Sequence, residues 1–245
     1  MAGSESLAGK QKVIEIRQLF QLDEFRDVLR LQQEIWSFAD IELLPLRFLV
    51  VVSRIGGHVF GAYDGAEMIA FCFAIPGLKP GNLPYLHSHM LGVQPGYRDT
   101  GIGRKLKLRQ REEALARGLN LIEWTFDPME LKNAYLNIVK LGAIVRRYSE
   151  NQYGVTASPL HGGLPTDRCY AEWWLNEDRP KGTNIVERIA YPFDIARIRA
   201  EDNERARAIQ QANALKFQTA FAQGLAVTGF ERSETEGTYL LEPWK

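Results

Sequence analysis

The chain has 245 residues, of which 45% are hydrophobic and 24% are charged, the composition of a globular protein. Its 30 Lys and Arg residues balance its 30 Asp and Glu residues, so net charge gives no reason to expect nucleic-acid or membrane-surface binding. Two cysteines exclude a disulfide framework and a four-thiolate zinc site, and no residue cluster predicts another metal. No apolar run is long enough to cross a bilayer, and the polar start of the chain is unlike a signal peptide. A cytoplasmic α/β protein is therefore expected.

Apolar spacing predicts an alternating order of strands and helices over roughly the first 175 residues. Strands are predicted at 13–17, 58–63, 68–75, 85–93, 119–126, 143–148 and 168–175, and helices at 23–36, 45–55 and 131–141, with one more ending at Arg117. Asp64-Gly65 predicts a hairpin turn between two of the strands. Two proline- and glycine-containing loops are predicted, one from Pro76 to Pro84 and one around Pro159, Gly162, Gly163 and Pro165.

The sequence changes character at about Pro180, which divides it into a domain over 1–180 and an extension over 181–245. Ala214, Phe217 and Phe221 predict one apolar face of a long helix that ends at Gly224. Strand patterns at 225–232 and 238–241 predict a hairpin, which is only marginally stable alone. The extension is therefore expected to pack on the domain or on a second copy of the chain, as in a homodimer.

The most informative segment runs from Leu91 to Gly103, where a strand leads through a glycine-containing turn into a helix. Such a helix start carries free N–H groups and the positive end of the helix dipole, which together bind phosphate. No Gly-Lys-Ser/Thr sequence closes the turn, which excludes a Walker loop. Arg98 and Thr100 stand where the Gly-x-Gly of a dinucleotide fingerprint begins. The segment thus predicts another kind of phosphate-binding turn, although glycine pairs also occur in ordinary strand-to-helix turns.

The wider pattern, Val-x-Pro-x-Tyr-Arg-x-x-Gly-Ile-Gly-x-x-Leu, resembles the pyrophosphate loop of the GNAT superfamily of acyl-CoA-dependent N-acyltransferases. The family motif reads Gln/Arg-x-x-Gly-x-Gly/Ala, and Arg98, Gly101 and Gly103 fill it here. The predicted order of elements over 13–175 is similar as well. The resemblance implies an α/β fold with a mixed, strongly curved sheet flanked by helices, to which this chain adds a helix and a hairpin.

The resemblance also implies acetyl-CoA as cosubstrate, while a longer or carboxylate-bearing acyl chain remains open. The residues that it implies for CoA binding lie in the strand end, the loop and the two helices that follow: Leu91, Gly92, Val93, Arg98, Asp99, Thr100, Gly101, Ile102, Gly103, Arg104, Asn133 and Asn137. The basic side chains of the helix after the loop are expected either to reach the phosphates of CoA or to form a solvated face.

Two of the four histidines, His87 and His89, lie on the strand that precedes this loop. Strand alternation predicts five side chains on one face: Tyr85, His87, His89, Leu91 and Val93. A neutral imidazole is suited to accept a proton from an amine. The arrangement resembles that of arylalkylamine N-acetyltransferases, which implies that His87 or His89 is the base. Half-buried structural histidines are the alternative, with Glu123 or Asp127 as the next candidate base.

One position departs from the family pattern. The family often carries a tyrosine, as the acid for the leaving thiolate, where this chain has Ile138. Tyr135 lies one helical turn earlier and becomes the candidate acid, with another phenol or a water left open. The expected function is direct transfer of an acyl group to a primary amine of a small molecule. The alternative is a CoA-binding sensor or interaction module with lost or weak catalysis.

Overall fold

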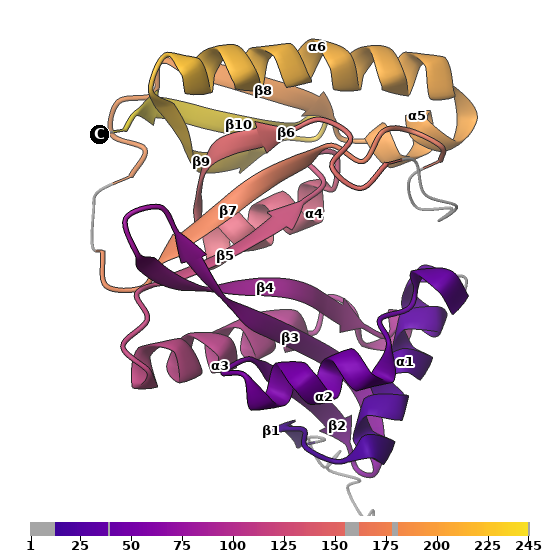
Figure 1. Cartoon of the computed structure of the whole chain (residues 1–245). Helices are drawn as coiled ribbons and strands as arrows, with labels where there is room; N and C mark the ends of the chain where they lie inside the picture. The colour runs from indigo at the N-terminus through magenta and orange to yellow at the C-terminus, as the bar shows by residue number, and fades with distance from the viewer. Residues whose placement is uncertain (1–12, 39, 155–161, 178–180, 245) are drawn as a thin grey trace, which may run out of the picture.

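The computed structural model describes residues 13–38, 40–154, 162–177 and 181–244. Pro159 of the second predicted loop and the predicted boundary at Pro180 lie outside the described residues. In chain order (Figure 1) the elements are β1 (Ile14–Gln18), α1 (Leu22–Trp36), η1 (Asp40–Glu42), α2 (Leu46–Arg54), β2 (His58–Asp64), β3 (Glu67–Lys79), β4 (Leu83–Val93), η2 (Pro95–Tyr97), α3 (Ile102–Ala116), β5 (Leu121–Phe126), α4 (Leu131–Ala134), η3 (Tyr135–Lys140), β6 (Ile144–Ser149), β7 (Arg168–Trp174), β8 (Glu187–Pro192), α5 (Ile195–Glu201), α6 (Asn203–Ala222), β9 (Leu225–Arg232) and β10 (Glu236–Pro243).

Within the described residues the strands form one ten-stranded sheet in the order β1-β2-β3-β4-β5-β7-β6-β9-β10-β8. All neighbouring strands are antiparallel except β4 and β5, which are parallel because α3 carries the chain back across the sheet between them. This mixed sheet with helices on its faces confirms the predicted α/β fold class.

Alternating side chains of β3 divide the core of the first half into two layers. Phe71 and Phe73 pack with α1 and α2, while Ala70 and Cys72 on the opposite face pack with Ile102 and other residues of α3. Figure 1 shows the same arrangement, with α1 and α2 in front of strands β2 to β4 and α3 behind them. The period of two in this buried strand therefore fixes which helices cover which face.

The β3–β4 hairpin is longer than the sequence predicts. Both strands continue through the predicted loop, pairing Lys79 with Leu83, and the chain turns only at residues 80–82. Pro76 is tolerated in β3 because the neighbouring strand β2 has already ended, at the pair His58–Ala74. The prediction of a loop over 76–84 is therefore wrong.

A β-bulge interrupts β4 at His89. Phe73 pairs with Met90 and Ala74 pairs with Ser88, which leaves His89 as the extra residue. Beyond the bulge the alternation is inverted, so Leu91 and Val93 pack against α3 rather than on the histidine face. The prediction of one face shared by all five side chains is correct for Tyr85, His87 and His89 and wrong for Leu91 and Val93.

Residues 187–243 continue the sheet of the preceding residues. Strand β9 meets β6 at the pair Val145–Val227, and helix α6 covers β6, β8 and β9, as Figure 1 shows at the top of the molecule. The fully buried ring of Phe217 lies 5.4 Å from Tyr148 of β6 and 5.2 Å from Tyr239 of β10, measured between ring centroids. Aromatic packing therefore joins the extension to the rest of the core.

Two local predictions differ in detail. The predicted cap of the first helix is Asp23, but the N-cap of α1 is Gln21, two residues earlier, which forms a capping box with Glu24. The predicted helix at 131–141 is present as α4 followed by a π-helical turn, η3.

The contacts of Phe217 generate a stability prediction. Replacing Phe217 with alanine removes a ring that is 0% exposed and has three aromatic neighbours, so we expect a loss of about 3–5 kcal/mol in the free energy of unfolding. Leu215→Ala on the same helix, where the side chain is 66% exposed, is the control and should change it by less than about 0.5 kcal/mol. Chemical denaturation followed by tryptophan fluorescence measures both. Equal effects of the two variants would contradict this account of the extension.

Candidate functional site

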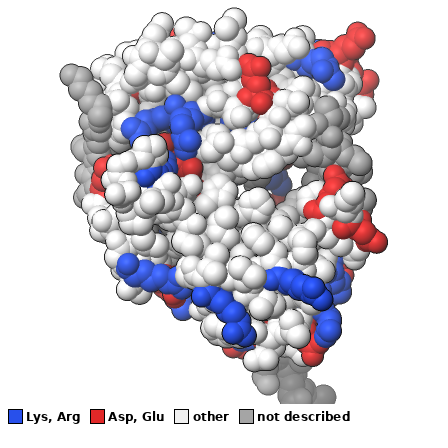
Figure 2. Space-filling view, viewed as in Figure 1, with Lys and Arg blue, Asp and Glu red and all other residues white. Residues whose placement is uncertain are grey.

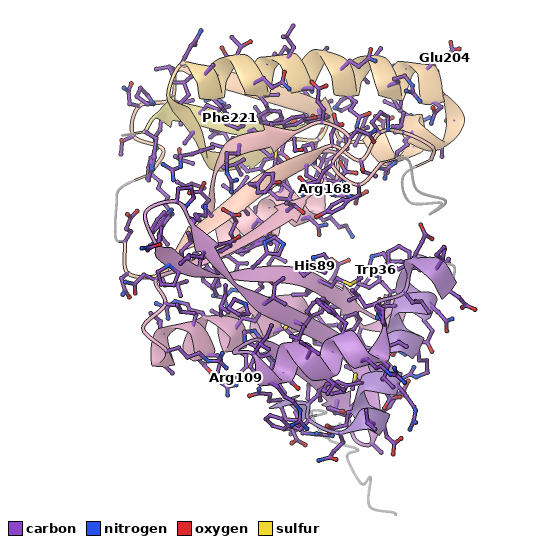
Figure 3. The ribbon with its side chains drawn as sticks, viewed as in Figure 1. Trp36, His89, Arg109, Arg168, Glu204 and Phe221 are labelled. Atoms are coloured by element: carbon purple, nitrogen blue, oxygen red, sulfur yellow. The ribbon has the colours of Figure 1, made fainter. Side chains whose placement is uncertain are left out.

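An opening in the sheet begins where β4 and β5 separate. Among the described residues the two strands pair only at Leu86–Ile122 and His87–Glu123, after which they diverge. The backbone of residues 88–93 therefore has no strand partner on the β5 side, although it still pairs with β3 on the other. Figure 2 shows the surface hollowed between the two halves of the molecule, and Figure 3 shows His89 and Trp36 on one side of the gap and Arg168 on the other.

The predicted phosphate loop lies at the C-terminal end of β4, next to this opening. The chain turns through Asp99 and Gly101, both with positive φ (62° and 86°), and α3 begins at Ile102. No side chain of the described residues caps this helix start, so its first N–H groups remain available to a ligand. A Cβ at Gly101 would meet no atom within 4 Å, and the nearest atom to one at Gly103 is Leu91 Cδ2 at 3.4 Å. The glycines thus leave open space at the helix N-terminus.

Side chains around the loop fix its shape and its charge. Thr100 donates a hydrogen bond to the Tyr97 carbonyl at 2.6 Å, and Arg98 Nε donates to the Val93 carbonyl at 3.4 Å. Asp99 forms an ion pair of 2.9 Å with Lys132 of α4, and this hydrogen bond lowers the pKa of the Asp99 carboxyl. The ion pair links the loop to the segment on the other side of the opening.

The basic face predicted for α3 is only partly available to a ligand. Arg104 is exposed in the first turn, whereas Arg109 and Arg117 pair with Glu113 near the other end of the helix. Lys107 points inward: its ammonium donates to Ser88 Oγ at 2.7 Å and lies 3.6 Å from the centre of the Trp124 ring. Burial lowers the pKa of Lys107 to about 7. The expectation of a phosphate-binding or solvated role is therefore wrong for Lys107.

The two candidate base histidines lie side by side on the face opposite α3. Their ring centroids are 5.9 Å apart, with Tyr85 6.5 Å from His87 and Phe73 5.3 Å from His89. Burial, followed by the neighbouring His89, lowers the pKa of His87 to about 4, and the packing of His89 lowers its pKa as well. Both imidazoles are therefore neutral at pH 7, the form that accepts a proton.

The alternative bases already have cationic partners. Glu123, opposite His87 in β5, is buried and pairs with both Lys79 and Arg147. Asp127 accepts a hydrogen bond from the Met129 amide and pairs with Arg199 at 3.3 Å. Burial raises the pKa of Asp127. Glu123 lies close enough to raise the proton affinity of His87 electrostatically, so it suits a supporting role.

The remaining predicted residues, the candidate acid and the two asparagines, lie in the segment after β5. Tyr135 has two cations near its ring centre, the guanidinium carbon of Arg232 at 4.1 Å and the ammonium of Lys140 at 5.3 Å. Asn133 is exposed, while Asn137 is buried and its backbone carbonyl accepts from the Ala143 amide. Ile138 belongs to the hydrophobic core.

A groove beside His87 includes residues that the sequence did not single out. It has a volume of about 460 Å³ and is lined by Ile75, Pro76, Gly77, Tyr85, His87, Glu123, Arg147, Gln152 and Tyr170. Arg147 and Tyr170 come from β6 and β7, which are distant from the histidines in sequence, and no local motif marks them. Within the described residues no three His, Cys, Asp or Glu side chains gather as metal ligands, and no helix is long and apolar enough to cross a membrane.

The sequence matches no protein-family model and no curated protein. Solved structures are similar in fold. An acetyltransferase assigned to the GNAT family from Desulfovibrio desulfuricans is 14% identical, with a TM-score of 0.52 over 66% of this chain and 99% of that one. The ribosomal-protein-S18-alanine N-acetyltransferase of Escherichia coli is 16% identical, with a TM-score of 0.53 over 71% and 100%. Salmonella typhimurium yncA, solved with its cofactor acetyl-CoA, is 16% identical, with a TM-score of 0.54 over 69% and 98%.

The chain has the GNAT fold. These structures match over nearly their whole length, while about a third of this chain lies outside each match. At identities of 14–16% the GNAT fold is what the comparison establishes.

The burial of Lys107 generates a prediction about stability and pH. Its pKa in the folded protein, about 7, lies below the 10.5 of an exposed lysine, so between these pH values the unfolded chain binds the extra proton. The contribution of Lys107 to the free energy of unfolding should therefore rise as pH increases from 7 towards 10.5. Lys107→Met should remove this rise and raise the free energy of unfolding at neutral pH by about 1 kcal/mol or more. Denaturant titrations at several pH values test this; a destabilised variant with an unchanged pH slope would show that Trp124 and Ser88 hold the ammonium charged.

Proposed function

We propose that the protein is an N-acyltransferase that moves an acyl group from CoA to the primary amine of a small molecule. The proposed acyl group is acetyl. The observation that carries this proposal is the unpaired edge of β4, which has an uncapped helix start at its end and two neutral histidines on its open face. A backbone edge, a phosphate-binding helix start and a proton acceptor are three requirements of acyl transfer from CoA to an amine.

The proposed position of CoA follows from those backbone groups. The pantetheine arm pairs with Leu91, Gly92 and Val93 as an added strand, since these residues lack a neighbour on that side among the described strands. The pyrophosphate binds the amides of residues 98–103, with the exposed Arg104 nearby. The similar fold of yncA, which holds acetyl-CoA, supports this placement. Asn133 is exposed, so it is the better candidate for a contact with the pantetheine arm. Asn137 is buried and is the weaker candidate.

The proposed reaction is direct attack of the amine on the thioester. The nitrogen forms a bond to the carbonyl carbon, the carbon–sulfur bond breaks, and the surplus amine proton passes to His87 or His89, directly or through water. Glu123, beside His87, stabilises the imidazolium that forms. A backbone N–H near the bulge polarises the carbonyl, an effect worth about 10²–10³ in rate for one donor.

The proton for the leaving thiolate comes from Tyr135 or from water in this proposal. The usual position of the acid holds Ile138, which is buried in the core. Tyr135 is half-buried at the start of η3, beside the cations of Arg232 and Lys140. Because CoA thiolate is a tolerable leaving group at neutral pH, turnover does not depend on this acid alone.

The glycine loop yields a test of CoA binding. A Cβ at Gly103 makes only ordinary contacts with Leu91 and Val93, so Gly103→Asp should fold, while its carboxylate occupies and repels the proposed phosphate position. Calorimetry should detect no CoA binding to Gly103→Asp. Gly103→Ala, which adds a methyl group without charge, is the matched control and should weaken binding less. Unchanged CoA affinity in a folded Gly103→Asp protein would overturn the loop assignment.

The histidines yield a test of catalysis. The double variant His87→Gln with His89→Gln should lower kcat/KM at least about a hundredfold at pH 7 while CoA still binds, since general-base help is worth about 10²–10⁴. Single variants should be milder if one water connects the two rings. The assay follows release of the CoA thiol. Near-normal turnover in the double variant would make the histidines structural, and CoA binding without turnover in the unmodified protein would favour a binding module.

The lowered histidine pKa moves the expected pH profile. A base with the ordinary pKa near 6.5 would lose activity just below neutral pH, whereas His87 accepts a proton only near pH 4. With a weakly basic arylamine as acceptor, which is not itself protonated near neutrality, kcat/KM should stay flat from pH 7 to about pH 5. A fall centred near pH 6.5 would contradict the burial described for His87.

A further inference from the structure

The open face beside His87 carries two buried carboxylates beneath three cations. Glu123 and Glu172 are paired neighbours on β5 and β7, and their side chains are only 4% and 3% exposed. Lys79 and Arg147 bind Glu123, and Arg146 binds Glu172 at 2.5 Å. The carboxylates are thus covered, whereas the side chains of Arg146 and Arg147 are 39% and 47% exposed.

The surface that a ligand meets here is therefore cationic. Three positive groups face two negative ones, and the exposed atoms belong to the positive groups. Figure 2 shows Lys and Arg atoms gathered near the turn of the β3–β4 hairpin, with a smaller number of Asp and Glu atoms beside them. A ligand bearing a negative group would gain from this surface, while a second positive charge would be repelled.

Arg147 lies between two adjoining grooves. One is the groove that His87 lines; the other, of about 450 Å³, runs from Arg146 and Arg147 towards Gln218 and Phe221 of α6. Arg147 and Tyr170 line both grooves, and the guanidinium carbon lies 4.2 Å from the centre of the Tyr170 ring. Stacking on Tyr170 restricts the orientation of the guanidinium, which prepares it to bind a ligand.

The guanidinium of Arg147 retains hydrogen-bonding capacity. Among the described residues it donates through Nη2 to Glu123, and its Nε lies 3.9 Å from Glu172, too far for a hydrogen bond. An arginine has five N–H donors, so the Nη1 side is left for a ligand in the groove. A carboxylate matches this planar group in a bidentate geometry.

We infer that the acceptor is an amine that also carries a carboxylate, with the amine at His87 and the carboxylate at Arg147. This inference rests on the proposed acyl transfer and names the class of acceptor for that site. His87 and Arg147 line the same groove, so one small molecule contacts both. Arg147 is then the residue that determines acceptor specificity, and Tyr170 positions it.

The test compares acceptors that differ only in the charge at their far end. Acetyl-CoA is combined with ω-aminocarboxylates of increasing length, from 3-aminopropionate to 6-aminohexanoate, with the alkylamines of equal length and with the corresponding diamines. We expect kcat/KM to be at least about tenfold higher for the best aminocarboxylate than for its alkylamine, with the diamine lowest. Arg147→Gln should abolish that preference. Arg188→Gln is the matched control and should preserve the preference, because it removes an exposed arginine of β8 that pairs with Glu231 of β9.

Further measurements distinguish a variant that fails to fold from one that has lost the acceptor preference. Arg147→Lys keeps a cation beside the buried Glu123 and should retain part of the preference if Arg147→Gln does not fold. Release of CoA with no preference for aminocarboxylates would overturn the inference and leave the acyl transfer standing. If no amine releases CoA, the proposed acyl transfer is overturned. Calorimetry with the same aminocarboxylates then tests the carboxylate site at Arg147 by itself. Binding that Arg147→Gln abolishes would then support the anion site, and the absence of binding would overturn it.

Discussion

The brief pairing of β4 with β5 is the constraint on which the site depends. Two residue pairs hold the parallel strands together, and beyond them the backbone of residues 88–93 faces an opening instead of a neighbour. Unpaired backbone groups must bind water or a ligand, because leaving them unsatisfied in a buried position is costly. The same divergence brings the bulge at His89, the glycine loop and the Glu123 side of β5 around one space.

The far side of this opening is held by residues from the end of the chain. Arg199 of α5 pairs with Asp127 and Glu130, Tyr239 donates to the Pro128 carbonyl at 2.7 Å, and Arg232 donates to the Leu131 carbonyl at 3.2 Å. All of these contacts fall on the connection between β5 and α4 or on the first residue of α4. The position of that connection, and with it the width of the opening, therefore depends on residues 195–243. Residues 195–243, about the last fifth of the sequence, therefore have a role in the proposed site, and no sequence motif predicts that role.

The sequence predicts the features that local chemistry determines. The hairpin predicted at Asp64-Gly65 is present, with the turn itself at Gly65-Ala66 because Asp64 still pairs with Glu67. The glycine loop at 98–103 begins a helix after a strand, as predicted. The bulge at His89 could not be predicted, because strict alternation continues through it in the sequence and only the pairing with β3 reveals the extra residue. In the sequence Lys107 cannot be told from the surface cations beside it, yet its ammonium is buried, where it donates to Ser88 and packs on the Trp124 ring. The cluster of Glu123 and Arg147 joins residues of different strands, so it arises from the sheet order alone.

Hydrogen–deuterium exchange in the presence and absence of CoA tests the central claim most directly, because it reports on each backbone amide that the proposed cofactor position involves. CoA should slow exchange at the amides of Leu91 to Val93 that face the opening and at those of residues 98–104. The β9–β10 hairpin, which lies in another part of the sheet, should exchange as before. Protection confined to other segments, or no protection at saturating CoA, would contradict the assignment of the opening between β4 and β5 as the acyl-CoA site.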